Sequence, residues 1–185
     1  MNYRIITTPR LTLGEIRERD FESLISIMKN EEVGKTYMVP DLPDHEAEMK
    51  LFSRLRELSE RDERYVFGIF LGDVLIGMLN DTEICGKTIE VGYAIHPDYW
   101  GKGYMTEALS AVIPFLFSAG FDEVLAGAFE CNPASLRVME KSGMKKSNLT
   151  ASVDYRGVTH KCIYYSVKQY NNQQAPKLIT GSTYG

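Results

Sequence analysis

The sequence predicts an α/β (α+β) protein with a mixed central sheet, on three observations. Short runs in which apolar and polar residues alternate, bounded by turn residues, are typical of antiparallel strands. Longer stretches with apolar residues three and four positions apart are typical of helices that cover a sheet. Between residues 88 and 129 a strand pattern, a helix pattern and a second strand pattern follow one another, which predicts a crossover between two parallel strands.

Three strands and two helices are predicted in the first half of the chain. Leu11 and Leu13 alternate with polar residues in the first strand, and Asp20 and Asp44 are suitable N-caps for the two helices. Gly72 lies in a short turn that joins the second and third strands as a hairpin. The predicted elements are a strand over 10–15, a helix over 21–29, a helix that opens at Asp44, and hairpin strands over 65–70 and 74–79.

The second half contains the crossover, a fourth helix and a final hairpin. Asn132 is a suitable N-cap, Pro133 suits the first helical position, and Gly143 suits the end of that helix. We expect a sheet of about six to seven strands, mostly antiparallel with one parallel pair, flanked by about four helices. The predicted elements are strands over 88–95 and 123–129, a helix over 106–118, and a hairpin turn over 153–158.

The length of 185 residues suits one domain, which we expect over residues 1–170. Hydrophobic residues make up 44% of the chain and charged residues 25%, which are ordinary values for a globular protein. The tail over 171–185 is polar and contains Pro176 and two glycines, so it has little reason to pack on the domain. A homodimer in which the tail contacts a neighbouring chain is one possible arrangement.

The composition argues against several classes of function. A net charge of −4 gives no general attraction to nucleic acid. Apolar runs are too short to span a membrane and the N-terminus lacks a secretory signal, so we expect a cytoplasmic protein without nucleic-acid or membrane partners. Three cysteines without metal-ligand spacing predict neither a disulfide framework nor a metal site: Cys85, Cys131 and Cys162.

The most informative segment is W-G-K-G-Y-M-T-E-A over residues 100–108. A glycine-rich turn that opens a helix is suited to bind an anion, because the backbone can approach closely and the first helical N–H groups are unpaired. The segment is not a P-loop, because Lys102 lies between the two glycines. It is not a dinucleotide fingerprint either, because the third glycine position is Thr106.

Together with its neighbours, this turn resembles the acetyl-CoA signature of GNAT N-acetyltransferases. The resemblance covers the strand and loop over 89–99, the turn over 100–108 and the helix over 132–144. The branch it resembles most is the ribosomal-protein α-amino (RimJ/RimL-like) one, whose cofactor turn often reads W-G-K-G-Y. It implies the GNAT fold, acetyl-CoA as the acetyl donor and an amine as the acceptor.

The resemblance also implies which residues contact the cofactor. The turn would bind the pyrophosphate mainly through its backbone, and the strand before it would bind the pantetheine arm. Asn132 would contact the same arm while it caps its helix. The implied cofactor-binding residues are Ala94, Ile95, Gly101, Lys102, Gly103, Tyr104, Met105, Thr106, Asn132 and Ser135.

An amine must lose its proton before it can attack a thioester, so a general base is needed. Glu90 is the first candidate because strand alternation places it on the same face as Gly92 and Ala94. The alternative is that Glu90 only pairs with a neighbouring strand. Other candidate bases are Glu83, Glu130 and His96.

By the same resemblance, Ser135 is the donor of a proton to the departing thiolate, with solvent as the competing source. Cys131 lies nearby, but direct transfer needs no nucleophile and we see no paired histidine. The favoured acceptor is the α-amine of a protein or peptide. The alternatives are a small amine (a polyamine, amino acid or aminoglycoside) and a CoA-binding module without catalysis. Val33 to Pro43 and the last hairpin would build the acceptor site, with Tyr37, Met38 and Tyr155 as candidate lining residues.

Overall fold

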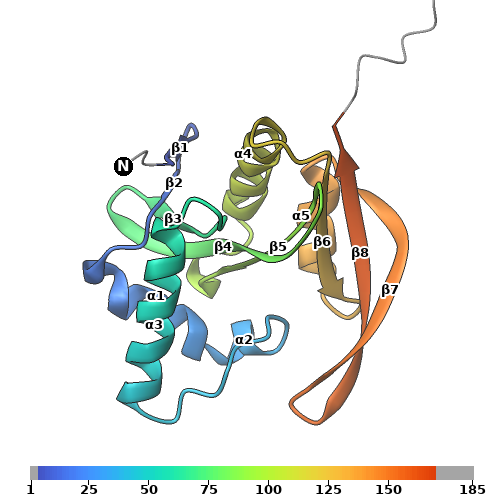
Figure 1. Cartoon of the computed structure of the whole chain (residues 1–185). Helices are drawn as coiled ribbons and strands as arrows, with labels where there is room; N and C mark the ends of the chain where they lie inside the picture. The colour runs from blue at the N-terminus through green and yellow to red at the C-terminus, as the bar shows by residue number, and fades with distance from the viewer. Residues whose placement is uncertain (1–3, 170–185) are drawn as a thin grey trace, which may run out of the picture.

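The computed structural model describes residues 4–169, and the predicted tail over 171–185 lies outside them. One eight-stranded sheet runs through the molecule in the order β1-β2-β3-β4-β5-β6-β8-β7 (Figure 1). The elements are β1 (Ile6–Thr7), β2 (Thr12–Gly14), α1 (Phe21–Lys29), α2 (Glu31–Gly34), α3 (His45–Glu60), β3 (Phe67–Leu71), β4 (Val74–Cys85), β5 (Thr88–Ile95), α4 (Tyr104–Ser118), β6 (Glu123–Phe129), α5 (Pro133–Lys141), β7 (Lys145–Tyr155) and β8 (Val158–Lys168), with short 3₁₀ helices at Glu18–Asp20 and Pro97–Tyr99.

This architecture confirms the predicted fold class. The sheet is antiparallel except between β5 and β6, where the predicted crossover through α4 makes one parallel pair. The described residues contain one strand and one helix more than expected. The additional elements are β1, which has only two residues, and α2, which has only four. Elements that short leave no periodic pattern in a sequence.

The helices cover the two faces of the sheet in separate groups. Leu109 of α4 and Met139 of α5 are fully buried in one hydrophobic core. Leu24 of α1 and Phe52 of α3 are buried in a second core on the other face. Neighbouring residues of β5 belong to different cores, because strand side chains alternate between faces. The strand can therefore present side chains to two separate environments.

Beyond Val91 the parallel strands β5 and β6 are no longer paired. Their register runs from Thr88 opposite Glu123 to Val91 opposite Ala126. Both strands continue, β5 to Ile95 and β6 to Phe129, but β6 then pairs only with β8. We call this unpaired stretch, between residues 92–95 of β5 and residues 127–129 of β6, the splay. It opens the sheet near its middle.

The sequence predicts capping side chains at three helix starts, and the structure differs from this prediction at one of them. Asp44 accepts a hydrogen bond from the Ala47 N–H (2.9 Å), as expected of an N-cap. Asp20 precedes α1, but its side chain accepts from the Arg17 N–H (2.8 Å) and makes no capping bond to α1. The 3₁₀ turn just before α1 therefore uses this carboxylate. None of the helices in residues 4–169 is both long and apolar enough to span a membrane.

Candidate functional site

A cavity of about 660 Å³ lies at the splay. Its size is within the range of small-molecule sites in proteins. Its walls come from both strands of the splay, from the glycine turn before α4, from the first turns of α5, from β4 and β8, and from the segment that contains α2. All the predicted cofactor-binding residues except Lys102 line it, and so does Glu90.

The glycine turn enters α4 with two residues in the left-handed region. Gly101 has φ +73° and Gly103 has φ +79°, which glycine adopts without steric cost. Gly103 is the N-cap residue of α4, so the first N–H groups of that helix point out at the turn. The side chain of Lys102 lies away from the cavity, because its Nζ donates to the Asp98 carbonyl oxygen (2.8 Å). Lys102 can therefore contribute its backbone but not its side chain in this conformation.

The strand β5 turns some of its backbone groups toward the splay. The N–H of His96 donates to the carbonyl oxygen of Ile76 in β4 (2.9 Å). Since ladder groups alternate, the N–H of Ala94 also faces β4, whereas the N–H groups of Tyr93 and Ile95 face the splay. The Ile95 carbonyl oxygen accepts a hydrogen bond from the Trp100 indole (2.8 Å), which attaches the glycine turn to this strand.

On the α4/α5 face, Ser135 is held by two neighbours. Its N–H donates to Oδ1 of Asn132 (3.1 Å), which confirms Asn132 as the N-cap of α5. Its Oγ lies 2.8 Å from the hydroxyl of Tyr93. The same hydroxyl lies 3.2 Å from the Ser135 carbonyl oxygen, so its single proton can be donated to either of the two Ser135 oxygens. Burial raises the pKa of Tyr93 to about 12, despite the opposing hydrogen bond with Ser135, so the phenol remains a neutral donor.

On the opposite face, Glu90 lines the cavity from β5. Burial is the main cause that raises the pKa of its carboxyl group; a hydrogen bond from Thr82 opposes the shift and the charge of Glu83 adds to it. Thr82 belongs to an irregularity of β4, where the register with β5 shifts between Asp81 and Glu83. A carboxylate with a raised pKa is a better proton acceptor than an ordinary one.

The other candidate bases lie outside the cavity lining. Glu130 is exposed and pairs with Lys161 (2.9 Å). Glu83 is exposed on β4. His96 caps the 3₁₀ helix at Pro97–Tyr99, where its Nδ1 accepts from the Asp98 N–H (3.3 Å). Of the four candidates, the structure brings only Glu90 to the cavity.

The segment between α1 and α3 closes one side of the cavity. Tyr37 and Met38 line it, as expected, and the Tyr37 hydroxyl donates to Oδ1 of Asn80 in β4 (2.8 Å). Burial raises the pKa of Tyr37 to about 12. Gly92 leaves room for Thr82 beside this ring, because a Cβ there would lie only 3.1 Å from the Thr82 Cγ2, whereas its 3.7 Å from the Tyr37 ring would be an ordinary contact.

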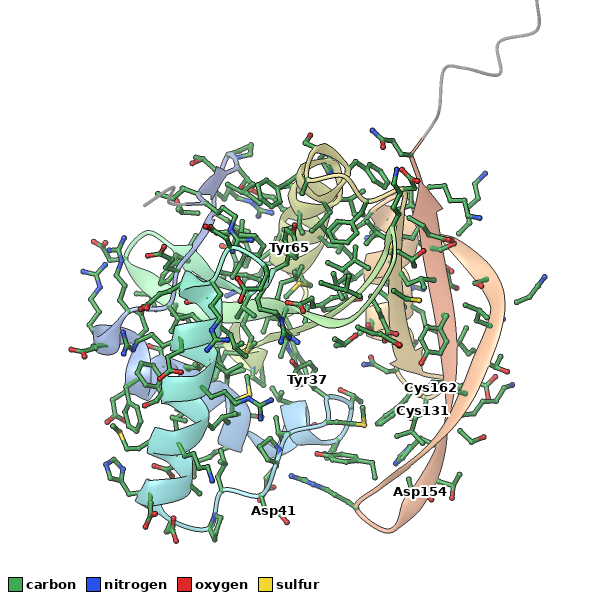
Figure 2. All side chains as sticks on the ribbon, viewed as in Figure 1. Tyr37, Asp41, Tyr65, Cys131, Asp154 and Cys162 are labelled. Atoms are coloured by element: carbon green, nitrogen blue, oxygen red, sulfur yellow. The ribbon has the colours of Figure 1, made fainter. Side chains whose placement is uncertain are left out.

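The hairpin β7–β8 forms the facing wall, and Tyr155 connects the two walls. Tyr155 is not itself in the lining. Its hydroxyl donates to the Tyr37 carbonyl oxygen (3.3 Å) and accepts from the Val39 N–H (3.4 Å). Figure 2 labels Tyr37 beside the α2 segment and Cys162 on β8, on the two sides of the cavity that both residues line.

Several lining residues were not singled out from the sequence. Tyr93 occupies an alternating strand position that looks like ordinary core, and its partner Ser135 is 42 residues away. Arg137 and Lys141 lie one helical turn apart on α5, a spacing that could have indicated a shared basic face. Further examples are Asn80, Thr82, Phe129 and Tyr164. Within residues 4–169 no acidic, histidine and cysteine cluster could hold a metal ion, and Cys131 is exposed outside the cavity.

Comparisons with known proteins agree on one family. A family model described as "Acetyltransferase (GNAT) domain" matches residues 10–145. The uncharacterized N-acetyltransferase YoaA of Bacillus subtilis (strain 168) is 28% identical over 162 residues, which cover 85% of this chain and 92% of that protein.

Solved structures show the same fold. The ribosomal alpha-N-protein acetyltransferase RimL in complex with coenzyme A has a TM-score of 0.79 at 20% identity, covering 89% of this chain and 98% of that one. The microcin self immunity acetyltransferase MccE in complex with acetyl-CoA and AMP has a TM-score of 0.77 at 16% identity, covering 88% and 94%. At these identities the likeness concerns the fold.

Proposed function

The chain belongs to the GNAT acetyltransferase family, and on that premise we propose that it transfers an acetyl group directly from acetyl-CoA to a primary amine, with the α-amine of a peptide or protein as the favoured acceptor. The observation that carries the proposal is the placement of Glu90 and Ser135. They line one cavity but approach the splay from opposite faces of the sheet. A base and an acid on opposite sides suit a reaction in which one group arrives while another leaves.

The residues of the cavity fit acetyl-CoA. The glycine turn and the start of α4 offer backbone N–H groups to a pyrophosphate. The N–H groups of Tyr93 and Ile95 can pair with the amide-containing arm and with the thioester carbonyl. Arg137 and Lys141 add positive charge at the cavity wall for phosphate groups. When bound, the cofactor supplies a thioester whose carbonyl carbon accepts the amine.

This fit divides the cavity into a cofactor end and an acceptor end. The cofactor end comprises the glycine turn, the splay and the first turns of α5. The acceptor end comprises Tyr37 and Met38 on one wall and, on the other, Phe129, Val153 and Tyr164. Glu90 lies between the two ends, on the face covered by α1 and α3.

Glu90 accepts a proton from the amine. A lysine side chain with a pKa of about 10.4 is almost fully protonated at pH 7, whereas an α-amine with a pKa of about 7.7 to 8.0 is neutral in roughly 10 to 17% of molecules. A carboxylate with a raised pKa is sufficient for the α-amine, because a substantial fraction of these amines is already neutral and only the remainder must be deprotonated. This match of base to acceptor supports the α-amine as substrate.

Ser135 holds a proton at Oγ for the departing thiolate. Tyr93 fixes the direction of this hydroxyl through the 2.8 Å contact between the two oxygens. The Asn132 cap fixes the backbone of the same residue. Both contacts orient the Ser135 side chain toward the cavity from the side of α5.

A small primary amine is the second candidate acceptor. Tyr155 joins the α2 segment to the hairpin, so the two walls of the acceptor end are connected. Connected walls favour a compact acceptor over a long polypeptide. The two candidates therefore differ in whether these hydrogen bonds must open.

Thiol release from acetyl-CoA in the presence of single acceptors tests the proposal. The acceptors are short peptides with different first residues, each compared with the same peptide carrying a blocked N-terminus, and a set of small amines. We expect release with free peptides and not with blocked ones. Release with small amines alone would assign the second candidate, and no release with any amine would contradict an acetyltransferase of amines.

A further inference from the structure

We propose that Arg10 is a positioning residue for the glycine turn: it holds the backbone over 101–103 in the shape that binds the cofactor. The inference rests on the proposed function only in that acetyl-CoA is the ligand of this turn. Arg10 lies in the segment between β1 and β2, more than ninety residues before the turn, and it is not in the cavity lining. It therefore acts through the turn and not on the ligand.

Arg10 contacts the turn and the helix behind it through separate atoms. Its Nη1 donates to the Lys102 carbonyl oxygen (3.0 Å). Its Nε donates to Oε2 of Glu107 (2.6 Å), and its backbone N–H donates to Oε1 of the same carboxylate (3.0 Å). The guanidinium carbon lies 4.5 Å from the centre of the Tyr104 ring. One side chain thus spans the middle of the turn and the first turn of α4.

The turn needs such support because its glycines are conformationally free. In the described part of the chain, no atom beyond Gly101 and its two chain neighbours lies within 4 Å of the position that a Cβ would take at Gly101. At Gly103, among residues 4–169 and apart from its chain neighbours, the only atom within that distance is Nη2 of Arg10, at 3.6 Å. Glycine loses more conformational freedom on ordering than any other residue, so an unheld turn would have to be ordered by the ligand itself. A turn that is already held binds more tightly.

Arg10 also compensates a charge that opposes anion binding. Glu107 lies in the first turn of α4, beside the proposed pyrophosphate site. Burial raises the pKa of Glu107, but hydrogen bonds from Thr8 and Arg10 outweigh this and hold it below its ordinary value, so the carboxylate stays ionised. The guanidinium offsets this negative charge where an anion must approach.

The rival interpretation is that Arg10 only anchors the N-terminal segment to α4. Thr8 offers the matched control, because its hydroxyl donates to Oε1 of Glu107 (2.6 Å) without contacting the turn. Thr8→Val removes an anchor to the same carboxylate. Arg10→Lys keeps a positive charge near Glu107, but an ammonium cannot reach Glu107 and the Lys102 carbonyl with the fork geometry of arginine.

The experiment is calorimetric titration of wild type, Arg10→Lys and Thr8→Val with CoA, well below the unfolding midpoint Tm of each protein. We expect Arg10→Lys to raise the Kd for CoA about tenfold, the loss of one charge-assisted contact to the turn. Thr8→Val should lower Tm to a similar extent, since it removes a part-buried hydrogen bond to the same carboxylate, and should leave the Kd within about twofold, since Thr8 makes no hydrogen bond to the turn.

Equal changes of Kd in the two variants, or an unchanged Kd in Arg10→Lys, would overturn the inference and leave an anchoring role. Because no acceptor is present, the titration is independent of which amine is acetylated. Wild-type protein that does not bind CoA would contradict the proposed function instead, so the two failures are distinguishable.

Discussion

The end of the cavity that we propose for the cofactor lies between regular elements, whereas the end proposed for the acceptor lies between an irregular segment and a hairpin. At the cofactor end, α4 begins at a left-handed glycine and α5 at an asparagine cap. At the acceptor end, Tyr37 and Met38 belong to the stretch between α2 and α3, and the facing wall belongs to β7–β8. Backbone groups of fixed geometry suit a ligand that is always the same, such as a cofactor. Side chains on segments that tolerate sequence change suit a ligand that differs between proteins, such as an acceptor.

This contrast predicts that single substitutions should separate the two ends. Changes at the cofactor end should alter CoA binding for every acceptor. Changes at the acceptor end should alter the choice of amine at constant CoA affinity. Substitutions between the ends should alter the rate of transfer.

The largest expected effect is at Glu90, between the two ends. Glu90→Gln removes the proton acceptor and should lower kcat about 100-fold, within the range of general-base catalysis, with the Kd for CoA unchanged. Steady-state kinetics and CoA titration measure the two quantities. Glu130→Gln is the control, since this exposed carboxylate pairs with Lys161 outside the cavity. A rate loss of similar size in both variants would count against Glu90.

The pH dependence follows from the direction of the shift at Glu90. Its pKa is raised, so kcat/KM should fall as the pH drops through a value above the ordinary one, because the protonated carboxyl cannot accept a proton. The effect of Glu90 on the free energy of unfolding has the opposite sign to that of an ion-paired carboxylate. Its stabilising contribution is present below the pKa of the unfolded state and is lost as the pH rises through the higher pKa of the folded state. Glu90→Gln should therefore have an equal or slightly higher Tm than wild type at neutral pH.

The next effect concerns the turn at the cofactor end. Gly103→Ala places a Cβ on a residue with φ +79°, which should shift the turn and raise the Kd for CoA about tenfold, in line with a left-handed strain of about 1–2 kcal/mol. Gly120→Ala is the control, because Gly120 also has a positive φ (+104°) but follows the far end of α4. Both variants should lose stability, and only the first should lose CoA affinity.

A smaller effect is expected at Tyr93. Tyr93→Phe removes the hydrogen bond to Ser135 and should lower kcat about 3- to 10-fold, the value of one hydrogen bond, with little change in the Kd for CoA. Tyr165→Phe loses a comparable bond to α5, from the Tyr165 hydroxyl to Glu140 (2.9 Å), away from the cavity. If Tyr165→Phe lowered kcat as much, the role assigned to Tyr93 would be no more than support of α5.

The smallest effect should separate the two candidate acceptors. Tyr155→Phe removes two long hydrogen bonds to the α2 segment and should raise kcat/KM for peptides about 2- to 3-fold relative to small amines, since weak bonds contribute little. Thr159→Val is the control, because its hydroxyl bonds Asp154 within the same hairpin (2.5 Å). An unchanged ratio of kcat/KM for peptides to kcat/KM for small amines would show that the hydrogen bonds between the α2 segment and the hairpin need not open for a peptide to bind.

Much of the cofactor end could be predicted from the sequence, because its signals are local. Strands 88–95 and 123–129 have the predicted bounds, Asn132 caps the start of α5 as expected, and Gly143 follows its end in the left-handed region. Binding of a ligand by backbone groups depends on glycines, caps and helix starts, and each of these is recognised from a few consecutive residues. The fold class followed from the same patterns.

The acceptor end and the fine geometry could not be predicted in this way. The contact of Tyr93 with Ser135 and that of Tyr37 with Asn80 join residues about forty positions apart. The carboxylate of Asp20 bonds Arg17 in a 3₁₀ turn, where a capping bond to α1 was expected. Such choices depend on tertiary packing, which local propensity does not determine.

The splay also gives the sheet two additional edges in its interior. A strand edge is normally a hazard, because its unpaired N–H and C=O groups can recruit a strand from another protein. Here the edges of β5 and β6 lie inside a cavity between helices, at a short stretch of residues 92–95 and 127–129. The unpaired stretch is only four residues long on β5 and three on β6, so it offers a strand of another protein few hydrogen-bonding groups while leaving these groups available to a ligand in the cavity.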